Sequence, residues 1–162
     1  MPRKKQTVIE FRNYELSPHF PILLLSGEHW KISDVPSGKL HIHNCLEIGL
    51  CLSDSGFMEL EGSRRPFKEG DITIISSSVP HTTYSSPGCA SQWAYLFADP
   101  GELLHPFFSG TDSENPRILS AAEGHLSMIL EKEKYPRLYL LIRELIQEME
   151  GAKEYKELAV RG

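Results

Sequence analysis

Apolar and polar side chains alternate along residues 40–52, and this alternation constrains the fold more than any other feature of the chain. The even-numbered positions carry the apolar residues Leu40, Ile42, Leu46, Ile48, Leu50 and Leu52. The odd-numbered positions carry His41, His43 and Glu47. Because successive side chains of a β-strand point to opposite faces, the segment predicts strand structure with both histidines and the carboxylate on one face. A bend near Asn44 would reset this phase.

Short segments of strand-like composition continue to residue 98, and turn-forming residues separate them. Residues 53–56 read SDSG, and the turn Glu69-Gly70-Asp71 precedes a β-branched run at residues 72–75. Short strands that recur about every 8–12 residues are typical of a β-sandwich or β-barrel. The sequence therefore predicts a mainly β domain as far as residue 98.

After residue 98 the pattern becomes helical. A short helix is predicted to start at Pro100, and residues 119–133 have a weak helical pattern. The strongest helix is predicted over residues 137–149, where apolar residues recur at helical spacing. These residues are Leu138, Leu141, Ile142, Leu145, Ile146 and Met149. Residues 152–160 resemble the start of another helix that stops in mid-pattern, so we expect a helical hairpin with a truncated second helix.

Length, charge and cysteine content exclude several classes of protein. The chain has 162 residues, enough for one domain with a short appendage, and a net charge of −5. That charge gives no overall attraction to nucleic acid or to an anionic membrane. The three cysteines have no CxxC spacing, and there is no apolar segment of membrane-spanning length. We expect a soluble cytoplasmic protein without a disulfide framework and without a membrane partner.

Four residues form a candidate metal site: His41, His43, Glu47 and His81. Imidazole nitrogens and a carboxylate oxygen suit divalent zinc, nickel, iron or manganese, and the ligand types alone do not choose among these metals. In the alternative, no metal is bound, and the same side chains line a pocket and form hydrogen bonds with a small molecule or with the backbone. No catalytic residue is predicted.

Trp93 and Tyr95 are candidates to line the same pocket. They share one strand parity, and each carries a polar group on a large apolar ring. If they face the interior of a barrel, they can contact a small-molecule ligand. The default alternative for both residues is a place in the hydrophobic core.

The motif H-x-H-x-x-x-E at residues 41–47, with Gly70-Asp71 and Pro80-His81 after it, resembles the cupin superfamily. A narrower resemblance rests on HxHxxxEIG at residues 41–49, GDIxII at 70–75, VPH at 79–81 and YLF at 95–97. These motifs, and a helical region after the strands, resemble the N-terminal domain of AraC-type transcriptional regulators over roughly residues 20–160.

The resemblance implies a cupin-like double-stranded β-helix, or jelly-roll barrel, followed by an α-helical hairpin. It implies an N-terminal arm over residues 1–20, an effector-binding barrel over 21–99, and a helical dimerisation and linker region over 100–162. The barrel would sense a small-molecule effector such as a sugar. A C-terminal helix-turn-helix domain, absent from this chain, would bind DNA.

The resemblance also implies a homodimer through the C-terminal helices. The expected contact residues are Leu138, Leu141, Ile142, Leu145 and Met149. The apolar pattern alone equally allows this helix to pack on its own barrel.

Two other functions compete with regulation. One is a stand-alone metal-dependent cupin enzyme, of isomerase or dioxygenase type, that uses the His/His/Glu/His set. The other is a metal-free small-molecule-binding module with no DNA partner.

Overall fold

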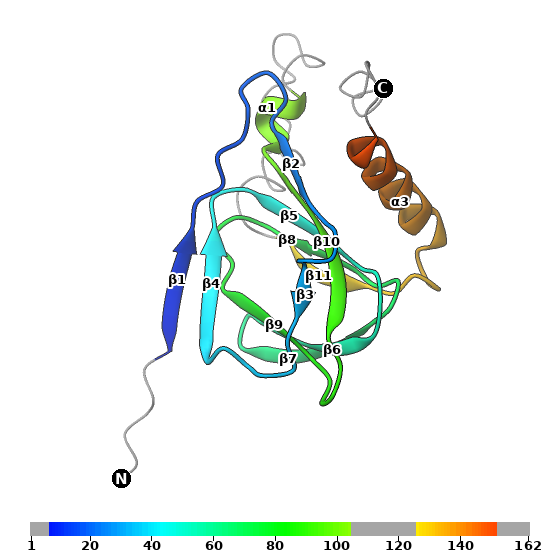
Figure 1. Ribbon diagram of the computed structural model, residues 1–162. Coiled ribbons are helices and arrows are strands. Elements are labelled where there is room, and N and C mark those ends of the chain that lie inside the picture. The colour runs from blue at the N-terminus through cyan, green and yellow to red at the C-terminus, as the bar shows by residue number, and fades with distance from the viewer. Residues whose placement is uncertain (1–6, 105–125, 152–162) are drawn as a thin grey trace.

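The computed structural model of the chain describes residues 7–104 and 126–151 (Figure 1). The strands in this part are β1 (Val8–Arg12), β2 (Ile22–Leu25), β3 (Lys31–Ile32), β4 (Lys39–His43), β5 (Leu46–Cys51), β6 (Ser55–Leu60), β7 (Ser63–Lys68), β8 (Ile72–Ile75), β9 (His81–Ser85), β10 (Ser91–Ala98) and β11 (Ser127–Leu130). The helices are α1 (Pro100–Leu104) and α3 (Pro136–Glu150). The predicted mainly β fold with a helix after the strands is confirmed.

The strands form two sheets that pack face to face (Figure 1). One sheet has the order β1-β4-β9-β6-β7, and the other has the order β11-β8-β5-β10-β2, with β3 attached to β10. β1 runs parallel to β4, whereas β5 pairs with β8 and β10 in antiparallel register. In the described residues these sheets form a sandwich and do not close into the complete barrel that we expected.

The alternation along β5 places its side chains as the sequence predicts. Glu47 is buried on the inner face, and Leu50 on the outer face belongs to the cluster that packs against α3. Aromatic rings join the two sheets across the interior, because Phe67 of β7 meets Trp93 of β10 edge to face at 4.8 Å. Gly49 makes room for the rings of Trp93 and Tyr95, since a Cβ atom there would clash with Thr73 and crowd both rings.

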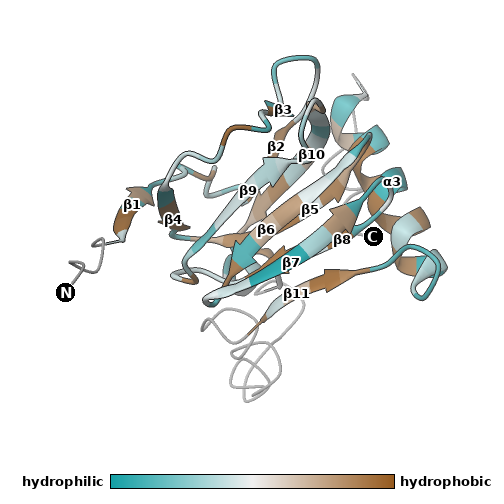
Figure 2. Cartoon of the chain, turned by 90° about the horizontal axis from the view of Figure 1, so that it is seen from below, coloured by the Kyte–Doolittle hydropathy of each residue, from teal (hydrophilic) through white to brown (hydrophobic). Residues whose placement is uncertain are grey.

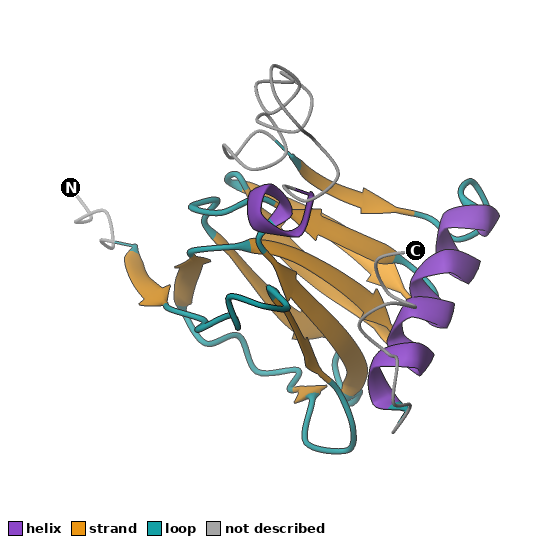
Figure 3. Cartoon of the chain, turned by 90° about the horizontal axis from the view of Figure 1, so that it is seen from above, coloured by secondary structure: helices purple, strands orange, loops and turns teal. Residues whose placement is uncertain are grey.

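Helix α3 covers part of the outer face of the second sheet (Figure 3). Ile142 and Ile146 are buried in the cluster that also contains Leu50, Ile72 and Leu96. The remaining predicted contact residues divide between two environments: Leu138, Leu145 and Met149 are half-buried against the same cluster, and Leu141 is exposed. The apolar stripe therefore packs mainly on its own chain. The second helix of the predicted hairpin lies outside the described residues.

Residues 127–130 form a strand, which corrects the weak helix predicted over residues 119–133. β11 pairs antiparallel with β8, where Met128 faces Ile74 and Leu130 faces Ile72. The partner strand lies about 55 residues away in the sequence, so the local pattern contained no trace of the pairing. Tertiary contact with the open edge of β8 determines the conformation here.

Candidate functional site

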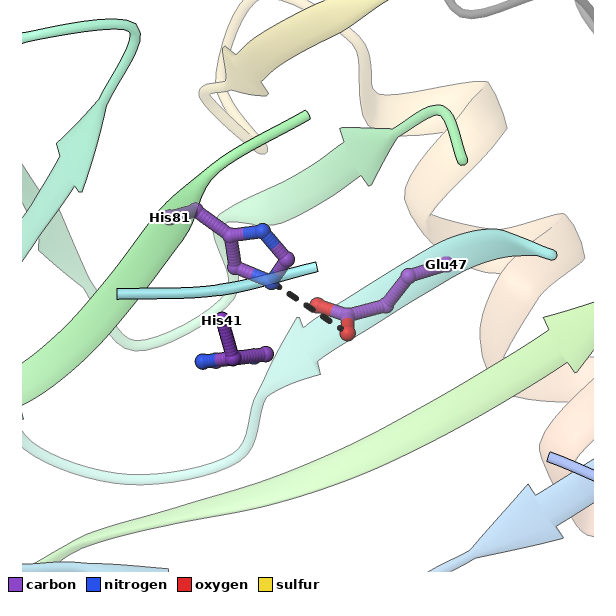
Figure 4. Close-up of side chains that lie close together, drawn as sticks. All are labelled: His41, Glu47 and His81. Carbon is purple, nitrogen blue, oxygen red and sulfur yellow. Dashed lines mark ion pairs between the residues drawn. The ribbon is translucent and has the colours of Figure 1, made fainter. Parts of the chain in front are cut away.

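Three predicted ligands converge between the two sheets. His41 and His81 are register partners on β4 and β9, and Glu47 faces them from β5 in the other sheet. One ligand atom from each lies within 4.8 Å of the others. Figure 4 shows the side chains pointing into one space, with an ion pair between His81 and Glu47. The site therefore combines residues from both sheets, and its geometry depends on how the two sheets pack.

Backbone carbonyls fix the orientation of two imidazole rings. Nδ1 of His43 lies 2.8 Å from the Cys45 carbonyl oxygen, and Nδ1 of His81 lies 2.8 Å from the Val79 carbonyl oxygen. A carbonyl only accepts hydrogen bonds, so each Nδ1 carries a proton and donates it. The other nitrogen of each ring, Nε2, then points toward Glu47.

Both Nε2 atoms approach the same carboxylate oxygen, Oε2 of Glu47. The distance is 3.2 Å from His43 and 3.6 Å from His81. Both nitrogens are buried, and neither has a well-formed hydrogen bond in the described part of the chain. In a neutral ring protonated at Nδ1, Nε2 presents a lone pair, which repels a carboxylate oxygen. A cation, either a proton or a metal ion, is needed to make this arrangement favourable.

The site fits a divalent metal ion by this chemical test. Metal-binding histidines usually donate their second ring N–H to a backbone carbonyl or carboxylate, as His81 does here. The group that could hold an ion consists of His41, Glu47 and His81. The fourth predicted ligand, His43, is fully buried and touches Glu47, but it does not belong to this compact group.

Burial and neighbouring charges set the protonation states at the site. Burial works to raise the pKa of Glu47, but hydrogen bonds and positive charge from the adjacent His43 and His81 rings, when these are protonated, outweigh it and lower the pKa below its ordinary value. For His41, burial followed by the nearby His81 lowers the pKa to about 3. At neutral pH, Glu47 is therefore ionised and His41 is neutral, which are the forms that bind a metal.

A cavity of about 160 Å³ opens beside these residues. Its polar lining includes His41, Glu47, His81, Thr82, Thr83, Ser37 and Arg12, and its apolar lining consists of Tyr14, Trp30, Ile32, Tyr95 and Phe97. The aromatic wall is ordered by stacking, since the rings of Tyr14 and Phe97 lie 3.9 Å apart. The cavity thus combines a few polar groups with large aromatic surfaces, as small-molecule sites do.

Of the two predicted pocket residues, only Tyr95 lines this cavity. Trp93 is fully buried behind it, stacked on Tyr95 at 5.4 Å, and its indole nitrogen donates to Ser91. Burial, with Glu47 as the next cause, raises the pKa of Tyr95 well above its ordinary value, so the hydroxyl stays protonated. Trp93 supports the wall of the cavity from the core.

Residues of the N-terminal segment also line the cavity, and the sequence did not predict them. Arg12 and Tyr14 line the cavity, and Tyr14 is attached through its backbone to Asn44. The Tyr14 N–H donates to Asn44 Oδ1 at 2.8 Å, and Asn44 Nδ2 donates to the Tyr14 carbonyl at 3.0 Å. Asn44 therefore holds this segment against the turn between His43 and Glu47. Thr83 is different, because it lies two residues after His81. The alternation of a strand places both side chains on the same face, so the sequence could have predicted its position.

No helix in residues 7–104 or 126–151 is long and apolar enough to cross a membrane.

Comparison with known proteins gives a family and a set of structural neighbours. A family model described as "AraC-like ligand binding domain" matches residues 31–161. No curated protein sequence matches the chain. Among solved structures, apo ToxT from Vibrio cholerae is 8% identical, with a TM-score of 0.49, and the match covers 86% of this chain and 51% of ToxT.

Two further solved structures match parts of the chain. The AraC-like transcriptional activator CuxR is 17% identical, with a TM-score of 0.44 and coverage of 73% of this chain and 40% of CuxR. A cupin 2 conserved barrel domain protein from Salinispora arenicola is 20% identical, with a TM-score of 0.39 and coverage of 50% and 62%. The chain spans less than two thirds of each of these structures. Because the family model matches most of its length, the chain belongs to the family of AraC-like ligand binding domains.

Proposed function

We propose that the chain is the effector-sensing domain of a cytoplasmic AraC-type transcription regulator, and that the effector binds in the cavity between the sheets. The observation that carries this proposal is the cavity itself, where His41, Glu47 and His81 meet an aromatic wall. Family membership supports a sensing role. The net charge of −5 supports placing DNA binding in a helix-turn-helix domain outside this chain.

The cavity fits a small, oxygen-rich effector. A volume of about 160 Å³ equals that of about five water molecules in the liquid, which suits a compact molecule such as a monosaccharide. Glu47 and the hydroxyl of Thr82 can hydrogen-bond hydroxyl groups, and Tyr14 and Trp30 offer flat apolar surfaces to the less polar face of a sugar ring. A sugar is therefore the first class of effector to examine.

A divalent ion held by His41, Glu47 and His81 belongs to the same proposal, with zinc, nickel, iron and manganese as the candidates. When bound, such an ion supplies a Lewis acid that can coordinate an oxygen of the effector. His43 contacts the carboxylate of Glu47 and limits its movement, and the Val79 carbonyl keeps Nε2 of His81 directed into the site.

Effector binding would be transmitted through the elements that line the cavity. Tyr14 forms part of the wall, and Asn44 links its backbone to the turn between two site residues. A ligand that contacts Tyr14 and Glu47 favours the conformation in which this segment is closed, which is a shift between populations. Homodimerisation through α3, with Leu140 and Leu141 exposed on its outer side, would pass this shift to a second chain.

A fusion protein tests the dimerisation that the proposed regulator function includes. The 162-residue chain is joined to a DNA-binding domain that recognises its operator only as a dimer. We expect operator affinity to rise at least about tenfold over that of the DNA-binding domain alone, because dimerisation adds avidity. An equal affinity would contradict the dimerisation part of the proposal.

Paired variants of the fusion locate the contact. Leu141→Glu should lower operator affinity, whereas Leu52→Glu, the same change at another exposed leucine, should not. If both variants bind the operator as tightly as the unmodified fusion, α3 is not the dimer contact.

The His41, Glu47 and His81 group also favours a second candidate function, a stand-alone metal-dependent cupin enzyme of isomerase or dioxygenase type. The two functions differ in the fate of the bound small molecule. A sensor returns its ligand unchanged, whereas an enzyme converts it. Mass spectrometry of a ligand after prolonged incubation with metal-loaded protein distinguishes them.

A further inference from the structure

Strand β1 exposes an unusual amount of apolar surface for the edge of a sheet. All five of its residues are exposed, and Val8, Ile9 and Phe11 have exposed fractions of 52%, 51% and 60%. Its single partner in the described part of the chain is β4, which it meets in parallel register (Figure 1). The outer edge of β1 therefore presents free backbone groups beside apolar side chains.

The opposite edge of the same sheet is built differently. β7 carries Arg64, Arg65 and Lys68, together with Pro66, which lacks a backbone N–H. Charges and proline are the usual features that prevent an edge strand from pairing with another chain. Figure 2 shows the contrast, with β7 largely hydrophilic and β1 largely hydrophobic. The β7 edge is therefore protected against pairing with another chain, and the β1 edge is not.

The apolar side chains of β1 continue onto β4. The register pairs Ile9 with Leu40 and Phe11 with Ile42, and paired residues share one face of a sheet. Leu40 and Ile42 are only half-buried. These four residues form a continuous apolar surface on the outer face of the sheet.

The charged residues of β1 are complementary to a second copy of the same strand. Glu10 and Arg12 are each 46% exposed, form an ion pair with each other within the chain at 3.2 Å, and lie on the other face from Ile9 and Phe11. If two copies of β1 pair antiparallel about a two-fold axis at Phe11, each Glu10 faces Arg12 of the second copy. An axis at Glu10 would instead place two carboxylates opposite each other, which is unfavourable.

We propose that β1 joins two copies of this protein by antiparallel pairing centred on Phe11. The pairing joins the two five-stranded sheets into one and brings the Phe11 side chains together. Each Glu10, which pairs with Arg12 of its own chain in the single copy, then also faces Arg12 of the second copy. The pairing is independent of the proposed function. Because Arg12 also lines the cavity, the contact lies beside the candidate site. It is also far from α3, which lies on the other side of the sandwich (Figures 1 and 3).

Site-specific disulfide formation tests the pairing and its register. The starting protein is the full 162-residue chain with Cys89→Ser, which leaves only the buried Cys45 and Cys51. In Phe11→Cys, the two new thiols lie across the axis, where Cα atoms about 4.5–5.5 Å apart permit a disulfide. In the control Ile9→Cys, the two thiols are about 14 Å apart because four residues separate each from the position opposite the other. Both positions are similarly exposed.

We expect Phe11→Cys to form at least about tenfold more disulfide-linked dimer than Ile9→Cys under mild oxidation. Equal yields, or no dimer from either variant, would overturn the proposal, because random collision treats the two thiols alike.

Charge exchange tests the register within the Phe11→Cys background. Arg12→Glu places carboxylates opposite one another twice and should reduce the dimer yield about tenfold. Adding Glu10→Arg recreates both ion pairs and should restore the yield. A double variant that stays as low as the single variant would overturn the Phe11-centred register.

Discussion

At the residue scale, the site depends on electrostatic interactions between three imidazole rings and the carboxylate of Glu47. Nε2 of His43 and of His81 share Oε2 of Glu47, while their Nδ1 atoms are engaged by backbone carbonyls. This arrangement needs a cation, and His41 places a third imidazole within reach of it. The metal proposal follows because the two Nε2 lone pairs and the charged Glu47 Oε2 repel one another unless a cation lies between them. Replacing the carboxylate removes the negative charge that attracts this cation.

Glu47→Gln is therefore expected to weaken zinc binding about 100-fold, since it removes a charged ligand. Isothermal titration of metal-free protein with zinc measures the affinity and the stoichiometry, which should be close to one. Glu59→Gln, the same change at an exposed position of β6, is the matched control and should bind zinc as the wild type does. Equal zinc affinities for the two variants would show that Glu47 is not a ligand.

The lowered pKa of His41 predicts a loss of stability in acid. The unfolded chain takes up a proton on this histidine below about pH 6.5, whereas burial keeps the folded ring neutral down to about pH 3. Stability is thus fully present above pH 6.5 and falls as the pH drops toward 3. Between pH 7 and pH 5 this histidine lowers the free energy of unfolding by up to about 2 kcal/mol.

Chemical denaturation in the presence of a chelator measures this effect. Wild type should lose up to about 2 kcal/mol more unfolding free energy than His41→Gln between pH 7 and pH 5. Identical losses would show that His41 titrates normally in the folded protein.

The sequence predicted part of this site because strand geometry is local. Alternation along residues 40–52 and the motif at 79–81 were enough to bring His41, Glu47 and His81 to one interior. Arg12, Tyr14 and Trp30 could not be predicted, because their positions depend on pairing between distant segments. Trp93 was also expected to line the cavity, and the structure places its ring behind that of Tyr95. Strand parity predicts which face a side chain takes and does not predict which ring lies in front.

At the element scale, α3 is anchored to the outer face of the second sheet. Its exposed and buried sides are sharply divided: Leu141 is 54% exposed, and the adjacent Ile142 is 5% exposed. The helix was predicted correctly to within a residue because its apolar spacing is regular. β11 was missed because a strand of four residues takes its conformation from β8 rather than from its own pattern.

This division predicts different effects for adjacent substitutions. Ile142→Ala should reduce the unfolding free energy by about 2–4 kcal/mol, since it leaves a cavity against the sheet. Leu141→Ala should change it by less than about 0.5 kcal/mol at low protein concentration. Urea denaturation of both variants makes the comparison, and similar losses would mean that α3 does not pack in this orientation.

At the scale of the whole molecule, the sandwich carries its functions on separate surfaces. The cavity is lined by residues of both sheets. Helix α3 covers the outer face of one sheet, and β1 lies at the edge of the other (Figures 1 and 3). Tyr14 and Arg12 connect the N-terminal segment with the cavity. Under the proposed function, this layout would let a small ligand in the interior influence the proposed contacts between chains.

The central claim is that this cavity binds a small effector. Equilibrium dialysis of the protein against a metabolite extract, with mass spectrometry of the retained compounds, tests it most directly. We expect a small molecule, recovered chemically unchanged, to be enriched by wild type and by Glu59→Gln but not by Glu47→Gln. A failure of wild type to enrich any compound over Glu47→Gln would contradict the account.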